Sequence, residues 1–176
     1  MRTGTLAFGL MTITLAGGLA MAAAGLRVNA TPSMPIGVWR IDSATAPAAR
    51  GDIVVVCLPA LPGARQGFRR GYLGAGLCPD KREPLVKPIA AVDGDLVTIS
   101  EAGIAVNGHL MPHIEALEVD DAGRRLRFMP DGAYRVEPGQ VWLLSGHDSR
   151  SFDSRYFGPV PVAAIRGRAQ PVLVFR

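Results

Sequence analysis

Aromatic residues are scarce in this sequence: they make up 6% of its 176 residues, which also include only two cysteines and three histidines. Because the net charge of +4 comes with few aromatics and no nucleic-acid-binding motif, we expect no nucleic-acid partner. We interpret the dispersed arginines as a surface that faces anionic lipid headgroups. His109 and His113 lie four residues apart but follow a hairpin turn rather than a helix, so they do not predict a metal site.

Charge is absent from Gly4 to Leu26. At 1.5 Å per residue this stretch would form about 34 Å of helix, enough to cross a bilayer core of about 30 Å. Arg2 and Arg27 flank it, so the positive-inside rule says little about orientation. We predict a membrane anchor over residues 1–27 and an exported domain over residues 28–176. The alternative is a cleaved signal peptide ending near Ala22–Ala24, which would also export the rest of the chain.

The two cysteines, Cys57 and Cys78, bracket a segment rich in glycine, proline and arginine. In an exported domain an even number of cysteines favours a disulfide. The alternative is one buried and one exposed thiol. We interpret Pro59 to Glu83 as a long surface insertion without regular structure, most of which a bridge between the cysteines would close.

Short segments of β-branched and alternating residues, separated by turn residues, dominate the rest of the chain. Asn107-Gly108 is a strong indicator of a hairpin. No long helix is apparent after Leu26, and no internal repeat. The exported part is therefore predicted to be a mainly β domain of one folded unit. The predicted strands are Gly37–Ile41, Ile53–Leu58, Leu85–Val92, Leu96–Ser100, Ile104–Val106, Gln140–Ser145 and Val172–Phe175.

Ser33 lies shortly after the predicted anchor, between Pro32 and Pro35. Proline fixes its own φ and biases the residue before it toward extended backbone, so this loop is stiff and non-helical. A stiff loop suits a nucleophile, because a small error in its position lowers the rate. The same features fit an extended linker that leaves a membrane helix, and this stretch alone does not separate the two interpretations.

Lys87 stands in the middle of the apolar run Leu85–Val92. A lysine is seldom buried unless it is paired or functional, although it can also face outward from an alternating strand. A serine nucleophile needs an adjacent base, and a neutral lysine amine can serve as one. At an ordinary pKa near 10.4 less than about one amine in a hundred is neutral at pH 8, but burial disfavours the ammonium form and raises that fraction.

Polar side chains crowd the loop from Ser145 to Arg155. If this loop continues as a strand, Ser151, Asp153 and Arg155 share one face, which would orient a lysine amine and hold its own Asp–Arg pair. The alternative is a solvated turn. His147-Asp148-Ser149 spells out a triad, but triads assemble in space rather than in sequence, so this order is not an indication of one.

Four segments, taken in order, resemble the signal peptidase I superfamily of Ser/Lys membrane peptidases. Within it, Ser33-Met34-Pro35-Ile36-Gly37 and Leu85-Val86-Lys87-Pro88 are more similar to the TraF-type peptidases of conjugative transfer. Pro88 and Asp93 stand where ordinary signal peptidases usually have arginine and proline. The four segments are the anchor with Thr31–Pro35, Arg50–Val56, Lys87–Asp95 and Ser151–Val160.

The resemblance implies that Ser33 is the nucleophile and Lys87 the general base. It implies that the Thr31 hydroxyl contributes to an oxyanion hole beside the Ser33 N–H. The implied fold is a single N-terminal transmembrane helix followed by a signal-peptidase-like coiled β-sheet domain on the membrane surface. No metal or organic cofactor is implied.

Three further positions follow from the same resemblance. Ser151 would orient Lys87, and Asp153 matches an acidic residue that is important in the conjugative branch, with Arg155 as its partner. The expected protein is a serine endopeptidase of the bacterial inner membrane, with its catalytic domain in the periplasm. Its expected substrate is a conjugative pilin precursor, released either as a ring or as a linear product, and components of a type IV secretion system are further expected partners. The alternatives are a general type I signal peptidase and an inactive β-module of a secretion channel.

Overall fold

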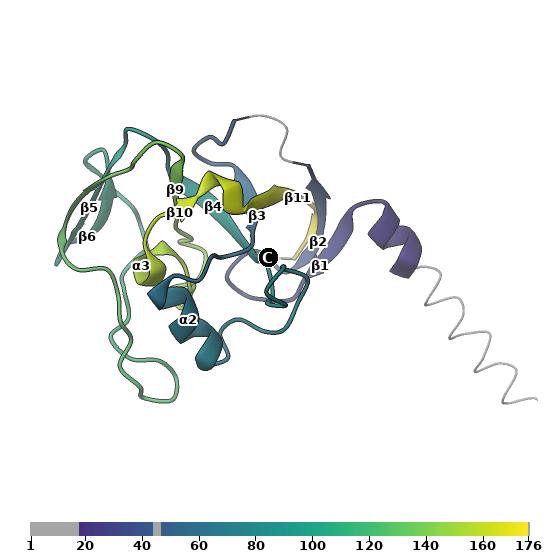
Figure 1. The fold of residues 1–176 in the computed structure, drawn as a ribbon, viewed down its shortest axis with the longest axis horizontal. Helices are drawn as coiled ribbons and strands as arrows, with labels where there is room; N and C mark the ends of the chain where they lie inside the picture. Colours follow the sequence, from purple (N-terminus) through teal and green to yellow (C-terminus); the bar gives the residue numbers. More distant parts are fainter. Residues whose placement is uncertain (1–17, 44–46, 176) are drawn as a thin grey trace, which may run out of the picture.

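Two antiparallel β-sheets form the body of the domain (Figure 1). The structure, a computed structural model, describes residues 18–43 and 47–175. The larger sheet has seven strands in the order β1 (Leu26–Asn29), β2 (Gly37–Asp42), β11 (Ile165–Val174), β3 (Ile53–Val56), β4 (Leu85–Ala91), β9 (Gln140–Leu143) and β10 (Val160–Pro161). The smaller sheet has four in the order β7 (His109–Leu110), β6 (Gly103–Val106), β5 (Leu96–Ser100) and β8 (Gly132–Arg135). The predicted mainly β domain is confirmed.

Strand β9 separates two hydrophobic cores. Successive side chains of a strand point to opposite faces, so Val141 and Leu143 enter one core while Trp142 and Leu144 enter the other. The first core lies under the larger sheet and the second under the smaller one, which Figure 1 places at the end of the domain away from residues 18–23. A strand that belongs to both cores joins the two sheets into one folded unit.

The hairpin predicted from Asn107-Gly108 is confirmed. Asn107 and Gly108 connect β6 to β7 with φ angles of 50° and 80°. Such turns need positive φ, which Asn and Gly adopt at low cost. The predicted strand Leu96–Ser100 coincides with β5, and the others except the last have counterparts with shifted ends. The predicted strand Val172–Phe175 is the end of the longer strand β11, whose two halves pair with β2 and β3.

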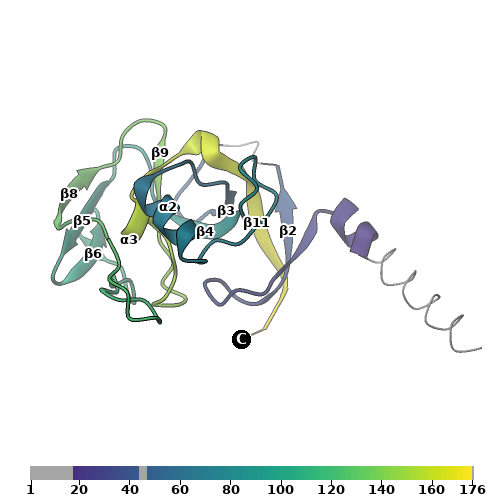
Figure 2. The ribbon, with the colours of Figure 1, turned by 60° about the horizontal axis from the view of Figure 1, so that its bottom comes forward.

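The interpretation of Pro59 to Glu83 as structureless was wrong, because this segment contains helix α2 (Pro62–Arg69). Gly63 and Gly67 disguise the helix, since glycine disfavours helices by about 1 kcal/mol each. Both are needed for packing: a Cβ on Gly63 would lie 2.2 Å from the Tyr156 carbonyl oxygen, and one on Gly67 2.5 Å from the Phe152 ring. Helix α2 therefore packs closely against α3 (Ser154–Phe157), as both ribbon views show (Figure 2).

The predicted anchor falls mostly outside the described residues, which begin at residue 18. Residues 18–23 are helical, and β1 begins at Leu26, so the predicted anchor and β1 overlap by two residues. Within residues 18–43 and 47–175 no helix is long and apolar enough to cross a membrane. The transmembrane anchor stays a prediction.

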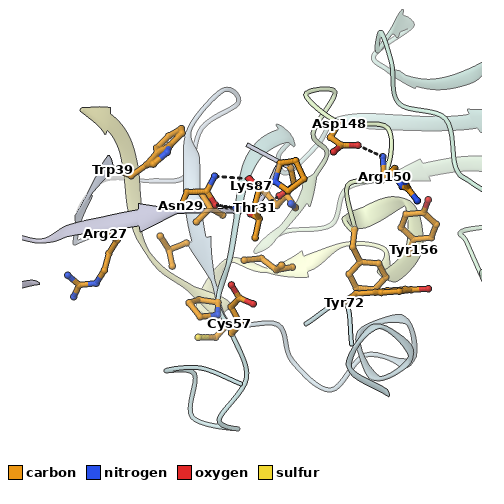
Figure 3. Close-up of a pocket in the computed structure, with 18 of the residues that line it drawn as sticks. Arg27, Asn29, Thr31, Trp39, Cys57, Tyr72, Lys87, Asp148, Arg150 and Tyr156 are labelled. Atoms are coloured by element: carbon orange, nitrogen blue, oxygen red, sulfur yellow. Dashed lines mark hydrogen bonds between the residues drawn. The ribbon is translucent and has the colours of Figure 1, made fainter. Parts of the chain in front are cut away.

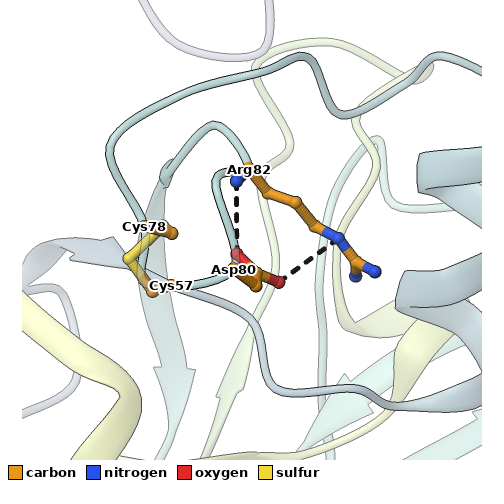
Figure 4. The surroundings of a disulfide bond; sticks show 4 residues. All are labelled: Cys57, Cys78, Asp80 and Arg82. Atoms are coloured by element: carbon orange, nitrogen blue, oxygen red, sulfur yellow. Dashed lines mark hydrogen bonds and ion pairs between the residues drawn. A yellow bond between two sulfur atoms is a disulfide. The ribbon is translucent and has the colours of Figure 1, made fainter.

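The predicted bond between Cys57 and Cys78 is confirmed as a disulfide (Figure 4). It joins the end of β3 to a tight turn in which Asp80 accepts a hydrogen bond from the Arg82 backbone N–H at 3.2 Å and forms an ion pair with Arg82 Nε, also at 3.2 Å. The bridge closes a loop of sequence separation 21 that includes α2. It therefore fixes the position of a segment that forms part of the cleft described below.

Removing this bridge with the double variant Cys57→Ser/Cys78→Ser is expected to lower the free energy of unfolding by about 3 kcal/mol, because the unfolded chain regains the entropy of the open loop. Urea unfolding of the variant beside the oxidised parent protein measures the difference. The parent protein unfolded under reducing conditions serves as the matched control and should fall to the same value. A loss below about 1 kcal/mol would contradict the expectation.

Candidate active site

A cleft of about 880 Å³ contains both residues predicted to carry the chemistry, Ser33 and Lys87. Strands β1 to β4 supply one side of it, and the segments around residues 72–85 and 117–126 supply the other. The close-up shows Asn29, Thr31 and Lys87 near the middle of the cleft, between Arg27 and Trp39 on one side and Tyr72, Arg150 and Tyr156 at the far end (Figure 3). The polar groups around Ser33 are therefore flanked by cleft on both sides.

One side chain, Asn29, closes the loop that carries Ser33. Its Nδ2 donates to the carbonyl oxygens of Thr31 at 3.0 Å, Met34 at 3.0 Å and Pro35 at 3.1 Å. Its Oδ1 accepts from the Thr31 N–H at 3.2 Å and from the Thr31 hydroxyl at 2.8 Å. Three carbonyl acceptors on one side fix which atom is the amide nitrogen. The loop is thus rigid for a reason beyond its prolines.

Thr31 Oγ1 also lies 3.5 Å from Ser33 Oγ. A hydroxyl has one proton to donate, and Thr31 gives it to Asn29. Ser33 can therefore donate to Thr31, but the predicted oxyanion role requires the Thr31 hydroxyl to rotate away from Asn29. That role stays a prediction.

Two further hydrogen bonds hold the same loop, one from a neighbouring residue and one from a distant part of the chain. Ser145 Oγ donates to the Ser33 carbonyl oxygen at 2.7 Å, and the Trp39 Nε1 donates to the Pro35 carbonyl oxygen at 3.0 Å. The Met34 side chain is buried with Trp39 in a third hydrophobic cluster. Neither Asn29 nor Ser145 had been given a role from sequence. Asn29 could have been recognised, because asparagine commonly bonds to backbone two residues ahead in turns.

Ser145→Ala is expected to lower kcat by about tenfold to a hundredfold with little change in KM, because the nucleophile loses one of its fixed contacts. Ser100→Ala, at an exposed position of β5 where the hydroxyl also donates to a carbonyl oxygen, is the matched control. Peptide cleavage kinetics of both variants provide the measurement. Equal rates in the two variants would show that the Ser145 contact does not position Ser33.

Lys87 points into the protein rather than outward. Alternation along β4 places it on the same side as Ile89 and Ala91, and its side chain is buried. Burial lowers the pKa of Lys87 from its ordinary value near 10.5 to about 8, with the nearby charges of Asp153 raising it and Arg155 lowering it by smaller amounts. Its amine forms no ion pair with any described carboxylate. The chain has 17 arginines and only one other lysine, Lys81, which lies in an exposed turn.

Asp153 and Arg155 form a fully buried pair. Arg155 Nε and Nη2 donate to the two carboxylate oxygens of Asp153, each at 2.8 Å. The remaining Arg155 N–H groups donate to carbonyl oxygens at Glu115, 2.9 Å, and Ser151, 2.8 Å, among others. Burial alone would lower the pKa of Arg155, but the hydrogen bonds and charge of Asp153 raise it above its usual range. The predicted pairing of Asp153 with Arg155 is confirmed.

This pair is linked to the backbone of Ser33 through Ser145. Asp153 Oδ2 accepts from the Ser145 N–H at 3.1 Å, and the Ser145 hydroxyl holds the carbonyl of Ser33. The predicted extended face of Ser151, Asp153 and Arg155 was wrong, because Asp153 caps helix α3 and its Oδ1 accepts from the N–H of Arg155. Asx side chains favour such caps over strands because they satisfy free N–H groups at the start of a helix.

Ser151 is buried, and its hydroxyl has no hydrogen-bond partner within the described ranges. The predicted bond from Ser151 to Lys87 is not formed in this structure. An unpaired buried hydroxyl is costly, so such groups are usually satisfied in some state of the protein. The orienting role of Ser151 stays a prediction.

Asp120 joins the two segments that border the far end of the cleft. It accepts hydrogen bonds from the hydroxyl of Tyr72, from Arg124 Nε at 2.7 Å and from Arg70 Nη1 at 3.3 Å. Burial would raise the pKa of Asp120, but these hydrogen bonds, the one from Tyr72 foremost, lower it below the usual range. The segment from Pro59 to Glu83 is thereby tied to the segment around residue 120.

The arrangement is suited to acyl transfer. A rigid half-buried serine and a buried lysine with a pKa of about 8 line the same cleft. His147 does not line it, and within the described ranges no group of three or more histidine, cysteine or acidic side chains is placed to hold a metal ion. A serine hydroxyl and a lysine that loses its proton at moderate pH are a pair of groups able to act as nucleophile and base.

A comparison with known families decides the assignment. The model of the family described as signal peptidase, peptidase S26, matches residues 2–174. The chain belongs to this signal peptidase family. Membership supports a peptidase activity, and it agrees with the mainly β fold.

Conjugal transfer proteins are among the relatives of this chain. A probable conjugal transfer protein TraF from Sinorhizobium fredii is 42% identical over 97% of this chain and 90% of its own length. Conjugal transfer protein TraF from Agrobacterium fabrum is 40% identical over 86% of this chain and 84% of its own, and plasmid transfer protein TraF from Escherichia coli is 37% identical over 86% and 85%. The resemblance to TraF-type peptidases is confirmed.

Among solved structures, a signal peptidase I from Enterococcus faecalis V583 is 20% identical, covers 70% of this chain and 97% of its own, and has a TM-score of 0.39. The likeness is too distant to add to the assignment, which rests on the family match and the TraF relatives.

Proposed function

We propose that this protein is a membrane-anchored serine endopeptidase that matures a conjugative pilin precursor with a dyad of Ser33 and Lys87. The catalytic domain lies on the periplasmic face of the bacterial inner membrane, held there by the uncharged stretch Gly4–Leu26. The observation that carries the proposal is the buried Lys87 amine, which has a lowered pKa and no ion pair with a described residue, in the cleft that contains Ser33. A lysine kept only for structure would be expected to pair with a carboxylate.

In this mechanism Ser33 Oγ attacks the carbonyl carbon of the scissile peptide bond while neutral Lys87 accepts the Ser33 proton. The oxyanion is stabilised by the Ser33 N–H and by the Thr31 hydroxyl after it rotates. Lys87 then gives its proton to the leaving amine. The amine departs, and an acyl ester remains on Ser33. Asn29 and Ser145 keep the loop in place through these steps, since a displaced nucleophile loses rate steeply.

The substrate assignment rests on the relatives, which are named as conjugal or plasmid transfer proteins, and on the similarity to the conjugative branch of the family. In that branch the product is a cyclic pilin, so we extend the proposal to this step. The amine of the pilin attacks the acyl ester, an amide forms, and the Ser33 oxygen leaves and regains a proton. An amine held in position can compete with water because effective molarities of oriented groups reach about 10⁵ M or more.

Exclusion of water requires a cover, and the segment from Pro59 to Glu83 is our candidate. Its residues Tyr72, Leu77 and Glu83 line the cleft, and the disulfide and Asp120 hold the segment down. The mass of the mature pilin tests cyclisation, because a ring is lighter by one water than the linear product cut at the same bond. A linear pilin with a free carboxylate would leave plain hydrolysis by the same dyad.

Ser33→Ala provides the test of the function itself. The variant should accumulate in membranes while pilin maturation stops, because the nucleophile is absent and the loop contacts of Asn29 and Ser145 do not involve the Ser33 hydroxyl. Mass spectrometry of the pilin from cells with each protein gives the result. Normal maturation by the alanine variant would refute the assignment.

The two alternatives predict different results. A general signal peptidase would also remove the signal peptides of unrelated exported proteins, whereas the proposed enzyme leaves them intact. An inactive β-module of a secretion channel would not react with a serine-directed acylating probe at Ser33, whereas the proposed enzyme is labelled there.

A further inference from the structure

A second cavity, of about 830 Å³, has an unusual lining. Helix α2 and the segment after Arg124 supply five arginines to it, and the described residues that line it include no carboxylate. The five are Arg65, Arg69, Arg70, Arg125 and Arg127. Only Arg70 is paired with an acid, at Asp120; the other four form no ion pair with any carboxylate of the described residues.

The positions of these arginines do not favour stability. Arg65 and Arg69 lie four residues apart on α2, where like charges face each other and repel. Arg65 also lies in the first turn of the helix, where the dipole disfavours a cation, and that turn contains no acidic residue. Arg125 and Arg127 both line the cavity from the segment that faces α2 across it. The four unpaired arginines are exposed, and together they concentrate positive charge that no described carboxylate neutralises, which suits an anionic ligand.

The cavity adjoins the catalytic cleft. Leu126 and Tyr156 line both spaces, and Asp120, which lines the cleft, holds Arg70, which lines the cavity. The Tyr156 hydroxyl accepts a hydrogen bond from the Leu117 N–H at 3.0 Å, so the partition between the two spaces is firmly placed. A polypeptide that lies in the cleft and passes Tyr156 would next meet the four unpaired arginines.

We infer that this arginine cavity is a recognition site for an acidic segment of the same polypeptide that occupies the catalytic cleft. The inference rests on the proposed peptidase function and adds a selection rule to it: substrates carry aspartate or glutamate residues at some distance from the scissile bond. Guanidinium groups pair with carboxylates through paired N–H donors, and an open cavity with four of them accommodates more than one acidic side chain.

Binding is tested on full-length Ser33→Ala protein in detergent, with a fluorescein-labelled hexaglutamate peptide as the probe. Arg65→Gln/Arg125→Gln is expected to weaken binding by about tenfold, and high salt should weaken it in the parent protein. The matched control, Arg40→Gln/Arg135→Gln, removes the same charge at exposed positions outside both spaces and should bind like the parent. Equal losses in the two double variants would overturn the proposal.

Phosphate-bearing ligands give the other outcome. Oligothymidylate and phosphatidylglycerol vesicles are offered to the same proteins under the same conditions. Either ligand could bind more tightly than the hexaglutamate peptide and lose this binding in Arg65→Gln/Arg125→Gln. That result would overturn the proposal and assign the cavity to nucleic acid or to a lipid surface.

Processing kinetics separate this inference from the proposed function. With the pilin precursor as substrate, Arg65→Gln/Arg125→Gln should raise KM by about tenfold and leave kcat unchanged, because the arginines bind the substrate away from the reacting atoms. Acylation of Ser33 in the parent protein by a small serine-directed probe tests the dyad alone. If the parent is acylated and KM is unchanged in the variant, the recognition role of the cavity is refuted and the dyad is not. If the parent is not acylated, the dyad is refuted, while the peptide-binding result still stands.

Discussion

Lys87→Arg is expected to abolish peptide-bond cleavage as completely as Lys87→Ala. Arginine keeps the positive charge but does not lose its proton in proteins, so it cannot take the proton of Ser33. The retained charge makes this variant more informative than alanine, because electrostatic stabilisation of the oxyanion would survive in it. Substantial activity in the arginine variant would point to another base.

The same assignment fixes the pH dependence of the parent protein. With the pKa of Lys87 lowered to about 8 by burial, kcat/KM should rise about tenfold per pH unit below that value and level off above it. Cleavage or acylation rates between pH 6 and 10 measure this profile. A profile that levels off near the ordinary pKa of histidine would contradict a lysine base.

The buried Lys87 ammonium should also lower the free energy of unfolding of the protein. Its pKa is about 8 when folded and near 10.5 when unfolded, so between these values the unfolded chain binds more protons. Stability therefore rises with pH across that window, and the full penalty, about 3 kcal/mol, is present below pH 8. Lys87→Met, with a similar volume and no charge, should be inactive yet more stable than the parent by about 2–3 kcal/mol at pH 7. Urea unfolding at pH 7 and pH 10 checks both statements, and equal stability of parent and variant at pH 7 would contradict them.

Local sequence was sufficient for features that depend on neighbours in the chain. Alternation identified β4 and its central lysine, Asn107-Gly108 identified a hairpin, and the even cysteine count identified the disulfide. The prolines beside Ser33 indicated a stiff loop. Each of these properties is determined within a few residues, or by a pairing that had only one possible partner.

Contacts between distant residues were not accessible in this way. The hydrogen bond from Ser145 to Ser33 joins residues 112 positions apart, and nothing near either residue indicates it. Helix α2 was missed because Gly63 and Gly67 disfavour a helix, and the reason for both glycines lies in Tyr156 and Phe152, far along the chain. Asp153 was assigned to an extended face because alternation of polar residues fits a strand, whereas the capping bond to the Arg155 N–H decides its conformation.

Arg155→Met is expected to lower the free energy of unfolding by about 3–5 kcal/mol, because it leaves the Asp153 carboxylate buried without its cation and several carbonyl oxygens without donors. Arg150→Met, which breaks the exposed ion pair with Asp121, is the matched control and should cost less than about 1 kcal/mol. Urea unfolding of the two variants gives the comparison. Similar small losses in both would show that the buried pair does not stabilise the fold.

The charges of the pair also act on Lys87, the proposed base, and the direction of the change in its pKa separates electrostatics from packing. The charge of Asp153 raises the pKa of Lys87 and that of Arg155 lowers it. The acylation profile of Asp153→Asn should therefore shift toward lower pH, and that of Arg155→Met toward higher pH. If these variants only loosened the core, water would reach Lys87 in both, and since hydration restores the ammonium form, both profiles would shift toward higher pH. Opposite shifts, measured with the small serine-directed probe on protein that remains folded, would identify the buried pair as a control on the pKa of Lys87. An alkaline shift in both would assign it a purely structural role.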